Sequence, residues 1–418
     1  MYRAAPVLIR EAEENQPEKN PWGIRFSRLF DMSNDSSLFK STRDIEGTQD
    51  SLLRLYEAKM VHHYDHRWAT YELDGETSRD CTLEEKKNPG YQSRPRYWVP
   101  ETEVTLRTAQ APKAVLDACR QEDTTLLTEA LQHWLAGYYL SQSDKNSAFE
   151  LFGEESDSNS GDMFGDGSDE KVRTALVTHA QYPLNNEEQR RIKSFLTEGG
   201  DAWPLALMLL KARRPEYLLG WRDICRSTDE RTVIASTFPI SGVGNNMPLL
   251  LLQSQDAHDA ALLQANLTSL TFDFVARHKV GGTHLNFFII KQLPVLSPNQ
   301  YTDIDKGFIV SRVCELVYTA SDLAPFAEKL GYADKPFAFD LPRRHQLQCE
   351  LDAYYAKLYG LTRDELRYIL DPSDLMGEEY PSETFRVLKK NEIREFGEYR
   401  TQRLVLEAWD KLETGELQ

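Results

Sequence analysis

The feature that most constrains the fold is an apolar pattern over residues 256–280, followed by a Gly-Gly pair. Apolar residues recur there at three- and four-residue steps, the period of a helix that buries one face. A glycine just past a helix commonly takes the left-handed conformation that ends it. We therefore expect one long helix that ends at about Val280, with a left-handed residue supplied by Gly281-Gly282. The periodic residues are Leu262, Leu263, Leu267, Leu270, Phe274 and Val275.

Short apolar runs on both sides of this helix predict strands. Residues 285–290, Leu-Asn-Phe-Phe-Ile-Ile, are typical of a buried strand. Residues 231–238 and 248–253 predict two further strands, separated by the turn residues 241–246.

Helical signals dominate the rest of the chain's second half. Residues 303–330 and 342–370 are amphipathic, and Thr362 with Glu365 matches the capping box that begins a helix. Asn185, followed by acidic residues, marks another helix start. The predicted fold class is α+β, with a mixed strand–helix domain followed by a helical C-terminal region.

The distribution of charge changes what the net charge of −17 implies about partners. A strongly acidic chain argues against nucleic acid. Residues 171–300, however, hold 14 Lys and Arg against 11 Asp and Glu, a balance of +3. Residues 141–170 hold nine acids and one lysine and are rich in Ser and Gly, so we expect a disordered acidic loop there. The charge of 171–300 therefore permits DNA contact.

Cysteine usage and hydropathy indicate the compartment. The five cysteines are scattered and include no Cys-x-x-Cys pair, which fits free thiols in a reducing cytosol. No apolar run approaches the roughly 20 residues that span a bilayer. Residues 1–10 also lack the basic start and apolar core of a signal peptide. We expect a cytoplasmic protein with no membrane partner.

The order of segments around the predicted long helix carries a resemblance. Trp-Arg-Asp at 221–223 is followed by an Arg-Thr strand, a loop, an apolar strand, the helix, the glycine corner and LNFFIIKQLPVL at 285–296. This order resembles the target-recognition domain of adenine-specific (N6) DNA methyltransferases of the type IIG restriction-modification and phage-defence group.

Other segments extend the resemblance from about residue 20 to the end of the chain. FDMSNDSSLF at 30–39 and LYEAKM at 55–60 resemble the bridge that joins the catalytic and recognition domains in that group. Residues 380–412 resemble its C-terminal segment. The order of the pieces, more than any single motif, carries the likeness.

The resemblance implies a domain organisation and partners. It predicts an N-terminal bridge region at 1–140, the acidic loop at 141–170, a DNA target-recognition domain at 171–300 and the helical region at 301–418. In that family the recognition domain reads double-stranded DNA, and a separate upstream domain transfers the methyl group from S-adenosylmethionine. A methyltransferase domain or subunit is therefore the expected partner, and S-adenosylmethionine is the expected cofactor of the complete enzyme.

Motifs for methyl transfer are missing from the chain itself. Adenine methylation needs a glycine-rich turn that leads into a helix and an Asp/Asn-Pro-Pro-Tyr/Phe loop that holds the flipped base. The chain contains no Pro-Pro dipeptide, and Gly242-Val243-Gly244 stands in a hairpin-like turn before another strand. We expect no catalytic residues and no cofactor in this chain, and its status as an enzyme stays open.

Two alternative functions stay open beside DNA recognition. Glu57-Ala58-Lys59, with Asp44 or Asp50 upstream, matches the end of a nuclease core in which two carboxylates hold magnesium. Magnesium-dependent cleavage by the purified chain would identify that activity. The other alternative is a scaffold in a defence complex, which would bind protein and not DNA.

Histidine spacing suggests a metal site only weakly. His62 and His66 would lie one helical turn apart, with Asp65 beside them, a spacing that zinc uses. The pattern lacks the Glu of a His-Glu-x-x-His motif. We favour a structural or DNA-facing role and expect no metal.

The candidate DNA contacts lie at predicted turns. Backbone amides in the glycine corner could approach a phosphate, while Thr283 and His284 could bond base edges. A solvated basic rim with no ligand is the alternative interpretation. The candidate DNA-binding residues are Arg222, Arg226, Arg231, Lys279, Gly281, Gly282, Thr283 and His284.

Overall fold

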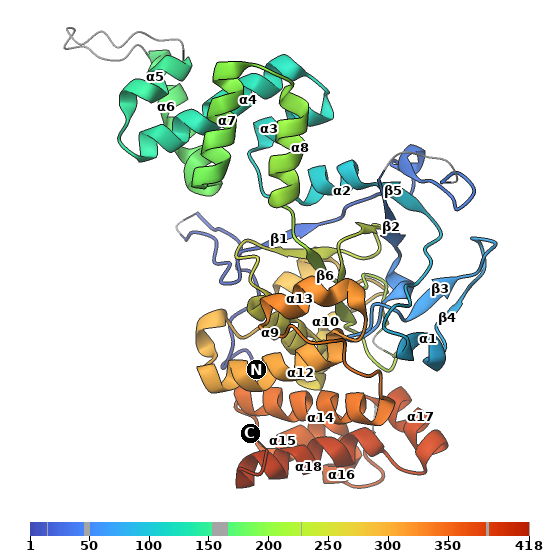
Figure 1. The fold of residues 1–418 in the computed structure, drawn as a ribbon. Helices are drawn as coiled ribbons and strands as arrows, with labels where there is room; N and C mark the ends of the chain where they lie inside the picture. Colours follow the sequence, from blue (N-terminus) through green and yellow to red (C-terminus); the bar gives the residue numbers. More distant parts are fainter. Residues whose placement is uncertain (15, 46–50, 153–165, 227, 382–383, 418) are drawn as a thin grey trace. The chain divides into compact units, whose positions relative to one another are not determined.

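The structure is a computed structural model that describes residues 1–14, 16–45, 51–152, 166–226, 228–381 and 384–417. The chain forms two compact units, one of residues 1–100 with 216–418 and one of residues 101–215 (Figure 1). Helices and several small sheets share the described chain. The fold is therefore α+β, as the sequence predicts.

The boundaries of these units differ from the domain boundaries expected from the sequence. The expected recognition domain, 171–300, is divided at residue 215. Its first part shares a hydrophobic core with residues 106–139, whereas its second part shares another core with segments from both ends of the chain. Apolar surfaces far apart in the sequence are buried together, and this burial defines each unit.

The first unit contains a four-stranded antiparallel sheet with the strand order β1-β9-β6-β7. Its edge strand comes from near the N-terminus, since Ile24 pairs with Leu252 and Ser27 with Leu249. The predicted strands at 231–238 and 248–253 correspond to β7 and β9. The strands are β1 (Ile24–Ser27), β6 (Tyr217–Trp221), β7 (Ala235–Pro239) and β9 (Leu249–Leu252).

A three-stranded sheet, β5-β2-β8, and the two-stranded pair β3-β4 complete the strands of this unit. β2 pairs antiparallel with β5 and parallel with β8, so the Gly242-Val243 segment adds a short strand rather than a plain turn. A Cβ at Gly242 would lie 2.5 Å from Val99 Cγ2, which explains the glycine. These strands are β2 (Leu52–Tyr56), β3 (Ala69–Tyr71), β4 (Ser78–Asp80), β5 (Trp98–Pro100) and β8 (Gly242–Val243).

Helices make up most of the C-terminal part of the first unit, as expected (Figure 1). None of the helices in the described ranges is long and apolar enough to cross a membrane. The α-helices are α1 (Leu83–Lys87), α9 (Ala257–Thr268), α10 (Leu270–Lys279), α11 (Phe287–Lys291), α12 (Asp303–Val317), α13 (Ala324–Lys329), α14 (Leu341–Leu358), α15 (Arg363–Leu370), α16 (Pro372–Met376), α17 (Arg386–Phe396) and α18 (Arg400–Thr414). The 3-10 helices are η1 (Ser36–Leu38), η2 (Ala58–Met60), η3 (Pro298–Gln300) and η4 (Ser321–Leu323).

The predicted long helix is two helices, α9 and α10, because Ser269 interrupts it. Ser269 is extended, at φ −67° and ψ 145°, and its hydroxyl accepts a hydrogen bond from the Phe272 amide. The Leu270 amide donates instead to Asp352 Oδ1 at 2.7 Å, an acceptor from α14. The helical period was correct on both sides of the break, but the partner that stabilises the break lies far away in sequence.

The prediction of a strand at 285–290 was wrong. Asn286 accepts a hydrogen bond from the Ile289 amide at 3.1 Å and begins the short helix α11. Phe287 then stacks on Phe26 at 5.0 Å, and Ile290 is buried. Phe288 points away and is 70 % exposed. A buried strand would have enclosed the side chains on both of its faces. The single helical turn of α11 instead buries Ile290 and leaves Phe288 in solvent.

The second unit consists of helices around their own core. Trp134 is fully buried there, and its Nε1 donates to the Tyr182 carbonyl at 2.7 Å. The Arg213 guanidinium covers its ring at 4.6 Å. The helices are α2 (Glu101–Thr108), α3 (Lys113–Arg120), α4 (Thr124–Ser141), α5 (Lys145–Phe152), α6 (Asp166–Gln181), α7 (Asn186–Glu198) and α8 (Ala202–Ala212).

The acidic segment 141–170 is helical in part, which corrects the expectation of a disordered loop there. Asp144 accepts hydrogen bonds from the amide and hydroxyl of Ser147 at 3.1 and 2.7 Å and so begins α5. Ala148 of that helix is buried. α6 begins at Asp166. Residues 153–165 lie outside the described residues, so the expectation for them is unchanged.

Candidate nucleic-acid interface

The candidate corner follows α10 and is held by backbone hydrogen bonds to residues 223–225. The Cys225 amide donates to the Thr283 carbonyl at 3.0 Å, and the Leu285 amide donates to the Asp223 carbonyl at 2.8 Å. Ile224 and His284 form an isolated antiparallel bridge between the two segments. The corner is therefore attached to β6, the strand that ends at Trp221 just before this segment.

The glycine pair does not end the helix in the predicted way. α10 ends at Val280, which is extended at φ −81° and ψ 97°. Gly281 and Gly282 are absent from the residues with positive φ, and a Cβ at either position would meet open space. The prediction of a left-handed glycine was wrong, because the bonds to 223–225 redirect the chain instead. Gly281→Val should therefore be tolerated.

Asp223, Arg28 and His284 form the polar centre of the corner, and the Phe287 ring lies beside it. Asp223 is 4 % exposed at its side chain, and its Oδ2 lies 3.1 Å from Arg28 Nη2 and 3.4 Å from His284 Nδ1. The Arg28 guanidinium also lies 5.2 Å from the centroid of the Phe287 ring. His284 is half exposed. With Nδ1 facing Asp223, the imidazole can direct Nε2 to solvent.

Exposed cations and exposed apolar side chains share this surface. Lys279 and Arg226 are exposed, and Lys279 Nζ lies 5.8 Å from the centroid of the Tyr2 ring. Ile224 is 53 % exposed beside His284, and Phe288 is exposed four residues further on. Single exposed apolar side chains are common on protein surfaces, so Ile224 and Phe288 do not by themselves indicate a partner. We call this surface the corner surface, defined by Arg226, Lys279, Gly281, Gly282, Thr283, His284, Ile224 and Phe288.

Arg222 and Arg231 lie inward, unlike the other predicted positions. Arg222 Nε donates to the Val61 carbonyl at 2.8 Å, and burial lowers the pKa of Arg222 to about 10. Arg231 donates to the Thr268 carbonyl, and its Nε lies 3.9 Å from the buried carboxylate of Asp273. Both guanidinium groups join segments of the first unit, so their role in the fold is structural.

The possible nuclease residues bind one another and a tyrosine. Tyr71 Oη donates to Glu57 Oε1 at 2.6 Å, and Lys59 Nζ lies 3.7 Å from the other oxygen. Asp44 accepts from Ser41, while Asp50 lies outside the described residues. No group of three or more His, Cys, Asp and Glu residues that could hold a metal ion occurs in the ranges the structure describes.

The histidine cluster makes bonds within the fold rather than a helical pair. Residues 62–66 form a turn in which Tyr64 has φ 55°. His63 Nε2 lies 2.7 Å from the Val233 carbonyl, and His66 Nε2 lies 3.0 Å from Asp322 Oδ1. Burial lowers the pKa of His62 to about 3. These contacts join residues 62–66 to Val233, which precedes β7, and to Asp322 of η4.

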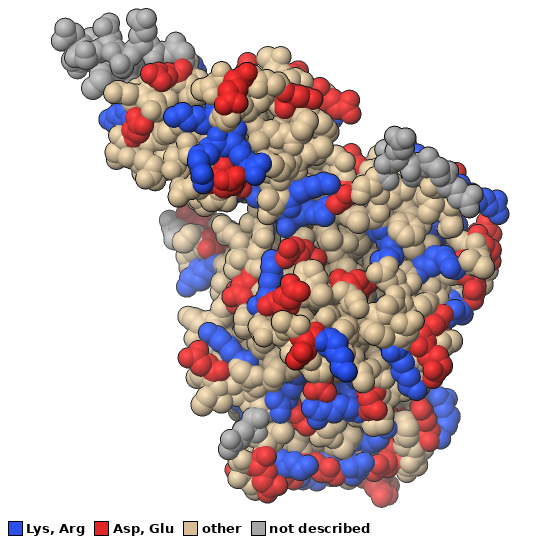
Figure 2. Space-filling view, viewed as in Figure 1, with Lys and Arg blue, Asp and Glu red and all other residues tan. Residues whose placement is uncertain are grey.

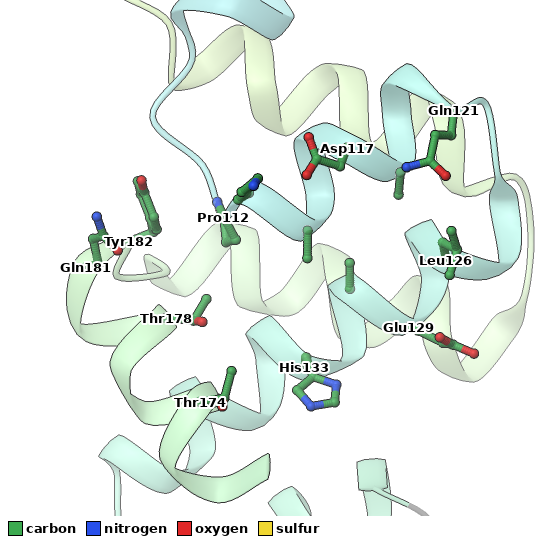
Figure 3. Close-up of a pocket in the computed structure, with 14 residues that line it drawn as sticks. Pro112, Asp117, Gln121, Leu126, Glu129, His133, Thr174, Thr178, Gln181 and Tyr182 are labelled. Atoms are coloured by element: carbon green, nitrogen blue, oxygen red, sulfur yellow. The ribbon is translucent and has the colours of Figure 1, made fainter. Parts of the chain in front are cut away.

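Two clefts lie away from the corner surface. One, of about 600 Å³, is in the first unit and is lined by α14, α17 and the histidine turn. The other, of about 750 Å³, is in the helical unit (Figure 3), where Thr174 and Thr178 of α6 lie near His133 of α4. Of the predicted DNA-binding residues, only Arg231 lines either cleft. In the first-unit cleft, His345 Nε2 lies 2.9 Å from Thr401 Oγ1, and the Thr401 hydroxyl donates to Glu392 Oε1 at 2.7 Å. The threonine proton is thus held by a carboxylate and not by the imidazole, so this contact does not pair a nucleophile with its base.

Three residues of this region, Arg28, Ile224 and Phe288, were not among the predicted contact residues. Arg28 lies far from the corner in sequence, and only the pairing of β1 with β9 brings it there. Ile224 was not part of any predicted element, and Phe288 was assigned to the strand at 285–290. The helical step between Phe287 and Ile290 is the signal that could have placed Phe288 in solvent.

Comparisons of the chain with protein-family models, with curated proteins and with solved structures found no match.

Proposed function

We propose that the chain is a sequence-specific reader of duplex DNA and that its corner surface makes the contact. Methyl transfer to adenine N6 would come from a separate domain or subunit that binds S-adenosylmethionine. The observation that carries this proposal is the corner itself: an exposed Thr283-His284 pair held by backbone hydrogen bonds to residues 223–225, with Lys279 and Arg226 also exposed. The order of sequence segments supports the same function.

The corner combines the two kinds of contact that DNA reading needs. Cations position a protein on the phosphate backbone without regard to sequence, while hydroxyl and imidazole groups can bond base edges. Asp223 lies 3.4 Å from His284 Nδ1 and favours a proton on that nitrogen. Nε2 of the same ring is then the nitrogen left to bond a base edge.

The first test measures DNA binding by the full chain. Duplexes are selected from a randomised pool, and affinities are then measured by fluorescence anisotropy at two salt concentrations on selected and scrambled sequences. Lys279→Ala should weaken binding to both and lower the salt slope by about one phosphate contact. Thr283→Ala and His284→Ala should reduce discrimination, since a lost base contact costs about 1–3 kcal/mol.

Lys335→Ala is the matched control, because Lys335 is exposed and lies outside the corner surface. It should bind as the wild type does. If the wild type selects no motif, or if Thr283→Ala and His284→Ala keep the wild-type motif and affinity, the corner does not read DNA.

A further inference from the structure

A small cleft in the first unit gathers arginines and aromatic rings away from the corner surface. It is lined by residues of β2, β3, β4 and β5, by Glu85 of α1 and by the segment 91–94, and its volume is about 270 Å³. Figure 2 shows Lys and Arg side chains beside the β3–β4 hairpin on the visible face. Pockets for whole drug-sized ligands measure about 300–1,000 Å³. This cleft therefore suits one chemical group of a larger ligand.

Strand pairing holds the cleft in shape. Arg54 of β2 lies directly opposite Trp98 of β5, and its guanidinium lies 5.8 Å from the centroid of the indole ring. The Arg94 amide donates to Thr70 Oγ1 at 2.9 Å, and the Tyr71 amide donates to the Arg94 carbonyl at 2.9 Å. Hydrogen bonds to neighbouring strands thus hold the backbone of Arg54 and Arg94 in place.

Among the described residues, Arg54 and Arg94 have no carboxylate in direct contact, although the charge of Arg54 also acts on the buried Asp322 carboxylate at longer range. Neither forms an ion pair with any residue in the described ranges: Arg54 donates to the Gln92 side chain, and Arg94 Nη1 lies 3.5 Å from the Tyr71 carbonyl. Arg79, in the same cleft, is different. It binds Glu72 and Glu85 at 2.7 Å each, and these hydrogen bonds raise its pKa. The cleft therefore keeps excess positive charge on two guanidinium groups.

A further donor in the cleft wall lacks a partner. Trp98 Nε1 is buried, and no described residue hydrogen-bonds it. An indole N–H can only donate. Trp98 lines the cleft together with Arg54 and Arg94, whose guanidinium groups are the donors that an acceptor-rich group could contact there.

We infer that this cleft binds a phosphate group, from either a nucleic-acid backbone or a free nucleotide. Planar guanidinium forks match the oxygens of phosphate, and charge-assisted bonds of this type are the strong ones. Phosphate offers acceptors to more than one fork at once, whereas a carboxylate has only two oxygens. The site stands independently of the corner surface, since neither Arg54 nor Arg94 belongs to that surface.

Calorimetry on the full chain tests the site with four probes at one ionic strength: inorganic phosphate, adenosine 5′-monophosphate, a short duplex and acetate. Arg54→Gln and Arg94→Gln should each weaken binding of the phosphate-bearing probe about tenfold or more. Arg96→Gln is the matched control, because Arg96 is exposed two residues from Arg94 and does not line the cleft. Thermal melts confirm that each variant is folded, and Arg94→Lys provides a conservative second variant.

The probes distinguish the sources of the phosphate. Binding of the duplex alone identifies a nucleic-acid backbone, whereas binding of phosphate or the monophosphate identifies a free ligand. The inference fails if no phosphate-bearing probe binds, if acetate binds equally well, or if Arg96→Gln weakens binding as much as Arg94→Gln. Failure at the corner would instead appear as an unchanged sequence preference in the Thr283 and His284 variants.

Discussion

Asp352 shows how burial sets the chemistry of a single residue in this protein. It is 5 % exposed, and burial raises its pKa from 3.8 to about 6. The positive charge of Arg231 and the hydrogen bond from the Leu270 amide act in the opposite direction and only partly offset that effect. Its Oδ1 is also the acceptor that stabilises the break between α9 and α10.

Asp352→Asn should change how stability depends on pH. The folded-state pKa lies above the unfolded value, so the stabilising proton is fully present below about pH 4 and is lost as pH rises through about 6. Asparagine keeps an acceptor for the Leu270 amide but carries no charge. The difference in unfolding free energy should therefore shift in favour of the variant by up to about 3 kcal/mol over that window.

Denaturant titrations of both proteins from about pH 4 to pH 7 measure this difference. Comparing the two proteins cancels the contributions of other buried groups, such as His62. A difference in stability that does not vary with pH would show that Asp352 titrates normally in the folded state.

At the scale of elements, two helical glycines have the same local setting and different neighbours. Gly137 lies in α4 and Gly307 in α12, and neither has a positive φ. A Cβ at Gly137 would lie 2.2 Å from the Ala175 carbonyl oxygen of α6, whereas a Cβ at Gly307 would meet open space. Only Gly137 therefore sets how closely two helices approach.

Alanine substitution at these glycines should give effects of opposite sign. Gly307→Ala should stabilise the protein by about 0.5–1 kcal/mol, the usual gain in a helix interior. Gly137→Ala should destabilise the helical unit by about 1–3 kcal/mol, because α6 must move away from α4. Chemical denaturation followed by circular dichroism measures both, and equal effects would contradict this account of the α4–α6 contact.

At the scale of the whole molecule, the two units contain separate hydrophobic cores. The core around Trp134 is made only of residues from 106–210, and the cores around Trp221 and Trp409 contain none of them. Unit boundaries at residues 100/101 and 215/216 follow from this separation.

Residues 101–215 should fold as an isolated fragment. Their core, the capped start of α7 and the Glu188–Arg213 pair at 2.5 Å all lie within the fragment. We expect a helical circular dichroism spectrum and a cooperative thermal transition. A non-cooperative melt of the fragment, with a single shared transition in the full chain, would show that this unit depends on the other one.

Features that depend on neighbouring residues were determined by the sequence itself. Asn185 caps α7 and Thr362 forms a capping box with Glu365 at α15, as predicted, because the acceptor and donor lie three residues apart. The apolar period of α9 and α10 and the strand β9 follow from the same local rules. The α+β class is the sum of such signals.

Tertiary structure alone decided where these elements break, turn and meet. Asp352 interrupts the long helix from a distance of 82 residues, and residues 223–225 redirect the chain at Gly281. Arg222 and Arg231 resemble Arg226 in sequence, yet their guanidinium groups bind carbonyls in the interior. Whether a cation faces solvent depends on which distant groups surround it, and local periodicity carries no information about those groups.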